Sequence, residues 1–237
     1  MPVTTPLQKI TRLNSNTYQL RFQRDEPFDW KPGQAVRLAF VGSHEHVGSR
    51  LSTPISLPGD DHLDFIVKVY PDGNGFTEKL PSIRAGQSFR LTPAYGTLFD
   101  RGPGVLVAGG SGITPFLSIL RSRLDETGTL DGYKLIYCNQ RYQDIVLKEE
   151  LFSMAGLEVI LVLSDEAVSG THFGRIDKKF IERETQNLSK KFYICGPAPM
   201  EADVSEMLEA LGVSASNIIR DERTQPSILE AVNVERD

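Results

Sequence analysis

The glycine-rich turn after residue 108 is the segment of this chain whose residue types and spacing most clearly suit ligand binding. The apolar run Val105–Ala108 leads directly into Gly109-Gly110-Ser111-Gly112-Ile113-Thr114-Pro115. A buried strand that enters such a turn and then a helix lets backbone N–H groups approach a pyrophosphate. The third glycine of the dinucleotide-binding pattern is absent, and Pro115 stands near its place, which the first helical turn tolerates. The turn indicates a nucleotide site, and the alternative is a tight strand–helix turn without a ligand.

A second segment, Phe192–Met200, repeats the arrangement of a strand end, a glycine and a helix start. In an open α/β sheet, ligands bind at the carboxyl ends of the strands. We therefore expect Cys195 and the turn at Gly110 to border one crevice. The alternative for Cys195 is a small buried apolar residue, a frequent fate of free cysteine.

Two polar segments in the first hundred residues are further candidates. Arg50-Leu51-Ser52-Thr53-Pro54-Ile55-Ser56 offers an arginine and hydroxyls that could grip a phosphate and hydrogen-bond a flavin ring. Gly75 before Phe76-Thr77 predicts a helix entry whose free N–H groups could bind the same pyrophosphate. Each segment by itself is more often a loop than a site.

The residues around these two polar segments predict a β-domain. Short runs rich in β-branched and aromatic residues recur between turn signals such as Lys31-Pro32-Gly33 and Pro58-Gly59-Asp60. Leu63–Val69 alternates apolar and polar positions, the period of a half-buried strand in a small barrel. The predicted strands are Thr17–Phe22, Ala35–Phe40, Leu63–Val69 and Ser88–Leu91.

The pattern changes at Arg101-Gly102-Pro103-Gly104, which predicts a linker between domains 1–102 and 103–237. Beyond it, apolar strands alternate with helices, which predicts a doubly wound parallel sheet and a two-domain β + α/β fold. The predicted strands are Val105–Ala108, Lys134–Cys138, Val159–Leu163 and Phe192–Cys195. The predicted helices are one carrying Phe116 to Leu124, one at Val146–Ala155 that stops at Gly156, one at Lys178–Glu184, and one carrying Met200 to Leu211 that stops at Gly212.

Composition places the chain among soluble globular proteins. Its 237 residues are 40% apolar and 24% charged, and its apolar runs are too short to cross a bilayer. Met1–Thr5 lacks the regions of a signal peptide, so we expect a cytoplasmic protein without membrane insertion. The net charge of −5 argues against nucleic-acid binding. Cys138 and Cys195 alone cannot make a disulfide framework or a metal cluster.

Taken in order, these segments resemble the ferredoxin–NADP reductase superfamily over nearly the whole chain, from Lys31 to Asp221. In that family a flavin-binding β-barrel precedes a nucleotide-binding α/β domain. Arg50-Leu51-Ser52-Thr53 stands where the family has Arg-x-Tyr-Ser/Thr. The other matching segments are Gly75-Phe76-Thr77, Thr92-Pro93-Ala94-Tyr95-Gly96, Ala108–Pro115, Tyr137–Arg141 with Asp144-Ile145 and Glu149-Glu150-Leu151, and Cys195–Met200.

The resemblance implies a role for each matched residue. Arg50 would bind a flavin phosphate, Thr53 would reach the N5 edge of the ring, and Cys195 would position the nicotinamide, so Thr53 and Cys195 are the candidate catalytic residues. The residues expected to contact FAD are Arg50, Leu51, Ser52, Thr53, Val67, Lys68, Val69, Gly75, Phe76 and Thr77. The residues expected to contact NADH or NADPH are Gly110, Ser111, Gly112, Thr114, Arg141, Ser164, Asp165, Cys195, Gly196, Pro197 and Met200.

Three features depart from the family. Ser52 replaces the tyrosine that usually stacks on the isoalloxazine, and no aromatic residue follows Tyr193. Either the flavin is held more loosely, or a partner completes its site. No cysteine cluster is left over, which excludes an iron–sulfur centre within this sequence, so the final electron acceptor must be external.

The leading interpretation is a flavin-dependent reductase that takes a hydride from NAD(P)H and passes electrons to ferredoxin, flavodoxin or a similar acceptor. The alternatives are an electron-transfer subunit of a larger complex and a flavin-free binding or sensing module. Two phosphate-binding segments favour FAD over FMN. Asp165 after the strand Val159–Leu163 favours NADH because a carboxylate repels a 2′-phosphate, whereas Arg141 could pair with that phosphate.

Charge is unevenly distributed between the halves. Residues 1–102 hold 12 Lys and Arg against 10 Asp and Glu, and the rest hold 14 against 21. The first half could therefore attract an acidic electron carrier such as ferredoxin or flavodoxin. The basic residues expected to do so are Arg12, Arg21, Arg24, Lys31 and Arg37, and their alternative is an ordinary solvated role on strands.

Overall fold

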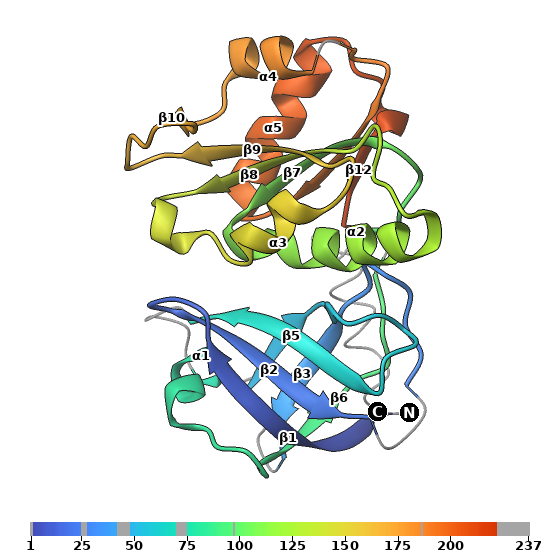
Figure 1. Ribbon diagram of the computed structural model, residues 1–237, viewed down its shortest axis with the longest axis vertical. Helices are drawn as coiled ribbons and strands as arrows, with labels where there is room; N and C mark the ends of the chain where they lie inside the picture. Colours follow the sequence, from blue (N-terminus) through green and yellow to red (C-terminus); the bar gives the residue numbers. More distant parts are fainter. Residues whose placement is uncertain are drawn as a thin grey trace, which may run out of the picture. The chain divides into compact units, whose positions relative to one another are not determined.

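The computed structural model describes residues 2–24, 28–41, 48–69, 75–96, 98–185 and 187–221. Backbone contacts group them into two compact units, which can be followed in Figure 1. The first unit comprises the described residues up to Tyr95 together with Thr114–Ser122. The second comprises Gly96–Ile113 and the described residues from Arg123 onward.

The first unit is a nearly closed antiparallel barrel. Its six strands are ordered β4-β3-β6-β1-β2-β5, so β4 and β5 are the two edges. Just beyond β4, a bridge joins Pro54 to Phe65 of β5, and the N–H of Ile55 donates to the carbonyl of Asp64 at 2.8 Å. The strands are β1 (Val3–Arg12), β2 (Thr17–Gln23), β3 (Val36–Phe40), β4 (Ser49–Ser52), β5 (His62–Lys68) and β6 (Ser88–Leu91).

Phenylalanines form the centre of the barrel core. Phe22 packs edge-on against Phe65 and Phe89, with ring centroids 5.8 and 5.1 Å apart. Phe76 begins the short helix α1 (Phe76–Lys79), and its ring lies 4.9 Å from that of Phe40. Burial of Phe76 therefore anchors α1 and the following turn η1 (Leu80–Ser82) to the barrel.

The second unit contains an entirely parallel six-stranded sheet in the order β10-β9-β8-β7-β11-β12. After β7 the chain adds β8 on one side and β11 on the other, so β7 lies at the topological switch point. The strands are β7 (Gly104–Gly109), β8 (Lys134–Asn139), β9 (Glu158–Leu163), β10 (His172–Phe173), β11 (Lys191–Cys195) and β12 (Ile218–Arg220).

Helices on both faces make this a doubly wound sheet, as predicted. Figure 1 shows α4 and α5 on one face and α3 on the other, and Phe180 and Val204 join the core cluster beneath α4 and α5. The helices are α2 (Ile113–Thr127), α3 (Lys148–Ser153), α4 (Lys178–Glu184) and α5 (Ala198–Ala210). Single turns occur at η2 (Gly110–Gly112), η3 (Tyr142–Asp144) and η4 (Ala215–Asn217).

The bounds of the second predicted helix were wrong. The helix expected over Val146–Ala155 covers only Lys148–Ser153, because Leu147 has φ 53° and Met154 is extended. Gly156, with φ 81°, belongs to the turn before β9 and does not terminate the helix. Gly212 does follow α5 with φ 84°, as expected.

The predicted linker segment is attached to the second unit by hydrogen bonds. The hydroxyl of Tyr133 donates to both carboxylate oxygens of Asp100 at 2.7 and 2.8 Å. The hydroxyl of Tyr193 donates to the carbonyl of Gly102 at 2.7 Å and accepts from the N–H of Arg101 at 2.9 Å. These bonds tie Asp100–Gly102 to β11 and to the residue before β8.

Candidate functional site

The first polar segment, Arg50–Thr53, lies on and just after β4, where the barrel closes. Arg50 is exposed, whereas Ser52 and Thr53 are buried. Helix α1, which begins at Phe76, contacts β4 although β5 intervenes in the sequence. The structure therefore brings together the two segments that the sequence analysis assigned to flavin phosphates.

Thr77 gives an independent reason to expect a bound polar group here. Its residue is 3% exposed, and its Oγ1 has no hydrogen-bond partner among the described residues. A buried unpaired hydroxyl costs about 1–3 kcal/mol, which a phosphate oxygen would relieve. Gly75 precedes it at φ 112° and ψ −73°, a conformation that only glycine adopts readily. These residues fit the phosphates of a flavin dinucleotide.

Two of the predicted flavin contacts have core side chains. Val67 and Phe76 are each 2% exposed and belong to the barrel core cluster. Only their backbone groups remain available to a ligand. Leu51, Lys68 and Val69 are half-buried, so their side chains retain some accessible surface.

In the turn after β7, one glycine has open space beside its Cα, and the helix that follows has no side-chain cap. Gly110 has φ 52°, and a Cβ placed there would meet nothing within 4 Å. Helix α2 begins at Ile113 with no side-chain cap and no acidic residue in its first turn. The N–H of Ile113 donates to the carbonyl of Gly110 within η2, so the helix dipole is the feature that would attract an anion here. Ser111 is half-buried and Thr114 is 7% exposed beside it.

The other two glycines of the turn are needed for packing against the Cys195–Met200 segment. A Cβ on Gly109 would lie 2.6 Å from Sδ of Met200 and 2.9 Å from Cδ of Pro197. A Cβ on Gly112 would overlap the carbonyl of Cys195. The structure thus joins the two predicted nucleotide segments, and it gives Gly112 a packing role that the sequence analysis had not recognised.

Glu201 is a site residue that the sequence analysis missed. Its Oε1 accepts a hydrogen bond from the N–H of Gly196 at 2.8 Å, and the residue is 5% exposed. The available signal was an acidic residue in the first turn of the helix that follows Cys195-Gly196-Pro197. A buried carboxylate therefore holds the strand end that carries Cys195.

Asp165 and the loop carrying Arg141 meet after β9 and β8. The N–H of Asp165 donates to the carbonyl of Gln140 at 3.0 Å, and the hydroxyl of Ser164 donates to Oδ1 of Asp165 at 2.6 Å. The N–H of Tyr142 donates to Oε2 of Glu166 at 2.8 Å. Asp165 and Arg141 are both exposed in this region, as a ribose-recognition site requires.

Within the described residues, none of the helices combines the length and the apolar composition that a membrane span needs. The same residues contain no cluster of three or more His, Cys, Asp or Glu side chains arranged to hold a metal ion.

Two oxidoreductase domain families match separate parts of the chain. Residues 4–99 match the oxidoreductase FAD-binding domain, and residues 106–206 match the oxidoreductase NAD-binding domain. The reductase component of propane 2-monooxygenase from Mycolicibacterium goodii is 30% identical over 94% of this chain and 68% of its own length. The Rhodococcus jostii counterpart is 29% identical over 95% of this chain and 64% of its own length.

Solved structures show the same fold. A ferredoxin NADP+ reductase from Neisseria gonorrhoeae, solved with bound FAD and NADP, has a TM-score of 0.79 and 20% identity. That likeness covers 89% of this chain and 92% of the solved one. The fold and family predicted from the sequence are confirmed: the chain belongs to the ferredoxin–NADP reductase superfamily, with an FAD-binding and an NAD-binding oxidoreductase domain.

Proposed function

We propose that this chain is an NAD(P)H-dependent flavoprotein reductase that passes electrons to a separate acceptor. The observation that carries the proposal is the turn after β7, where an open Gly110 and an uncapped α2 lie beside the Cys195–Met200 segment. We assign flavin binding to residues 1–102 and nucleotide binding to 103–237. FAD, when bound, supplies the acceptor for a hydride from the nicotinamide.

The chain's own residues would orient the two cofactors. Arg50 would pair with a flavin phosphate, Thr77 would donate to the same group, and Thr53 would face the reactive edge of the ring. The N-terminus of α2 would hold the dinucleotide pyrophosphate. Cys195 would position the nicotinamide, because its backbone is fixed against Gly112. We propose FAD as the flavin, and the mass of the cofactor released from the chain as purified, without added flavin, tests this, with FMN as the contradicting result.

We propose NADH as the preferred donor because Asp165 presents an exposed carboxylate where a 2′-phosphate would lie. Glu166 adds a second carboxylate in the same loop, although it accepts the N–H of Tyr142. Arg141 is the residue that would oppose this preference. The ratio of kcat/KM values for NADH and NADPH decides between them.

We propose an acidic protein, of the ferredoxin or flavodoxin kind, as the electron acceptor. Two relatives are reductase components of propane 2-monooxygenases, which favours a protein acceptor over a small molecule. Among the basic residues, Arg21 is neutralised by Asp64 through contacts of 2.8 and 2.6 Å. Arg24 donates to the carbonyls of Pro58, Asp60 and Phe28.

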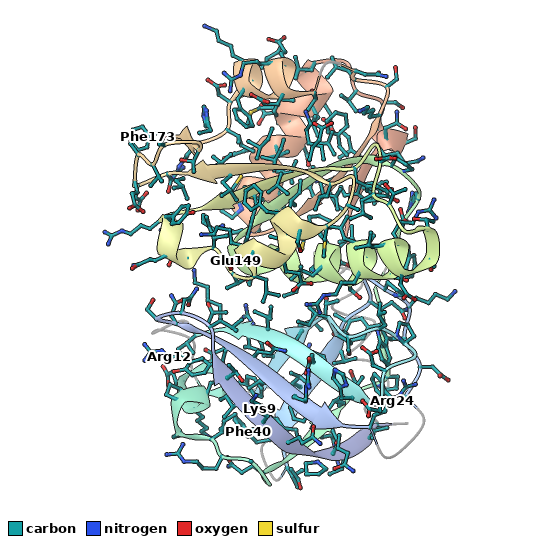
Figure 2. All side chains as sticks on the ribbon, viewed as in Figure 1. Lys9, Arg12, Arg24, Phe40, Glu149 and Phe173 are labelled. Carbon is teal, nitrogen blue, oxygen red and sulfur yellow. The ribbon has the colours of Figure 1, made fainter. Side chains whose placement is uncertain are left out.

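The positive charges that remain available lie elsewhere on the barrel. Lys9 and Arg12 are exposed on β1 and are labelled in Figure 2. Among the described residues, the Arg12 side chain donates to the neutral carbonyls of Asn14 and Ser15. Transfer to an acidic carrier should slow as salt screens these charges over about 8 Å at physiological ionic strength. Electron-transfer rates that change neither with salt nor with the charge-reversing double substitution Lys9→Glu/Arg12→Glu would point to a small-molecule acceptor.

A further inference from the structure

The peptide between Cys195 and Gly196 is held at both of its polar ends. Its carbonyl oxygen packs against Gly112, where even a Cβ would overlap it. Its N–H donates to Oε1 of Glu201 at 2.8 Å. On a third side, a Cβ on Gly196 would lie 2.6 Å from Cε of Met200 and 3.1 Å from Cα of Gly109. Rotation of this peptide is therefore restrained by packing on one side and by a single carboxylate on the other.

We propose that Glu201 is the positioning residue that sets the orientation of Cys195 and Gly196 toward the nicotinamide. The proposal rests on the reductase function given above and adds a residue to its machinery. Glu201 touches the backbone and acts through it, because it bonds to Gly196 and is 5% exposed. Without the carboxylate, the Gly196 N–H would be left unpaired, and the peptide could turn to find another acceptor.

The burial of Glu201 indicates that its carboxylate has a specific role. A buried carboxylate loses its hydration, so it is retained only where hydrogen bonds and local dipoles compensate. Glu201 has both, since it accepts from Gly196 and lies in the first turn of α5, at the positive end of a 13-residue helix.

The carboxylate also distinguishes the two helix ends near the site. The first turn of α5 contains Glu201, whereas the first turn of α2 contains no acidic residue. An anionic pyrophosphate is repelled from the first end and attracted to the second. The end of α2 is therefore the more favourable one for the phosphates, and the Cys195–Gly196 backbone remains for the uncharged nicotinamide end of the dinucleotide.

Three variants of Glu201 separate the effect of losing the hydrogen-bond acceptor from the effects of losing side-chain volume and charge. Glu201→Gln keeps an oxygen for the Gly196 N–H, and Glu201→Leu fills the same space without an acceptor. Glu201→Ala is a second variant without an acceptor, in case the leucine disturbs packing. Glu206→Ala, on an exposed position of the same helix, is the control for helix effects.

The rate of flavin reduction at saturating NADH is the first measurement. Glu201→Leu and Glu201→Ala should lower it by about tenfold, the scale of one misplaced buried hydrogen-bond donor, with the FAD dissociation constant unchanged. Glu201→Gln should stay within about threefold of the wild type, and Glu206→Ala should match it. Hydrogen exchange of the Gly196 amide, followed by NMR without any cofactor, should accelerate in the leucine and alanine variants only.

The possible failures are distinguishable. A wild-type chain that binds FAD but is reduced by neither NADH nor NADPH would overturn the proposed function itself. A wild type that is reduced, with leucine and alanine variants that match it in rate and in Gly196 exchange, would overturn the role of Glu201. Equal losses in the glutamine and leucine variants would also overturn it, because glutamine keeps the acceptor.

Discussion

Gly112 and Cys195 are in direct backbone contact, although 82 positions separate them along the printed sequence. The contact joins the start of α2 to the end of β11, the two strand–helix junctions at the switch point of the sheet. No side chain fits between them, because a Cβ on Gly112 would overlap the Cys195 carbonyl. The nucleotide turn and the Cys195 segment are therefore one structural feature.

Gly112→Ala should damage the nucleotide site severely. The clash is with backbone, which cannot move aside as a flexible side chain would, so we expect a loss of about 1–3 kcal/mol or more in unfolding free energy. The rate at which NADH reduces the bound flavin should also fall, while the FAD dissociation constant stays near the wild-type value. Gly59→Ala is the control, since Gly59, like Gly112, has no positive φ, but nothing lies within 4 Å of a Cβ placed there. Equal unfolding free energies for the two variants would contradict the packing argument.

Arg50→Ala should weaken FAD binding and leave the NAD-binding domain folded. A charge-assisted bond to phosphate contributes about 1.5–3 kcal/mol, which corresponds to about a 10- to 150-fold rise in the FAD dissociation constant. Fluorescence titration with FAD measures it. The exposed Arg84, replaced by alanine, serves as the control for loss of a positive charge. An Arg50 variant with wild-type affinity would remove Arg50 from the flavin site.

Asp165→Asn should raise the kcat/KM for NADPH relative to NADH. Removing the carboxylate removes its repulsion of the 2′-phosphate, and one unscreened charge contact at the surface corresponds to about 1 kcal/mol, or about fivefold. Steady-state kinetics with both donors gives the ratio, and Asp203→Asn on α5 controls for net charge. If the wild type already prefers NADPH, the NADH assignment is wrong.

Stability should fall in alkaline solution. Burial raises the pKa of Cys138 to about 12 from 9.0 and that of Tyr193 to about 12 from 10.0. Burial also raises the pKa of Tyr133 and Tyr137. The folded chain keeps these protons at a pH where the unfolded chain releases them. The stabilisation is therefore complete below pH about 9 and is lost as the pH rises toward the folded-state values, by about 1.4 kcal/mol per pH unit for each group.

Urea unfolding between about pH 8 and 11 measures this loss. Cys138→Ala should flatten the pH dependence, because it removes the group that begins to titrate first in the unfolded chain. A stability that is constant over this range would show that these groups are accessible to solvent in the folded chain.

Regular elements with strong patterns were predictable from the sequence. Ser88–Leu91 and Lys178–Glu184 were predicted to the residue, since apolar periodicity and turn residues bound them clearly. The strand β1 was missed because it contains Pro6 and buries Thr5 in place of an apolar residue. The strands β10 and β12 have only two and three residues, too few to show a period.

The segments that form the site were predictable from the sequence, but most of the contacts between them were not. The glycine turn and the Cys195 segment were both identified, and their proximity followed from the rule for parallel sheets. Which glycine packs and which stays open depends on Cys195 at the end of β11 and on Met200 in α5. The bond from Gly196 to Glu201 likewise depends on where α5 begins after β11, which the order of residues alone does not specify.

Anaerobic mixing of the FAD-reconstituted chain with NADH is the decisive experiment for the reductase function. We expect a yellow protein whose oxidised-flavin absorbance bleaches within a single turnover, because the chain binds both the hydride donor and the flavin. The bleaching should require the Cys195–Met200 segment and the turn at Gly110 to be intact. A chain that takes up no FAD, or that binds FAD but keeps its oxidised absorbance in excess NADH and NADPH, would contradict the proposed reductase function.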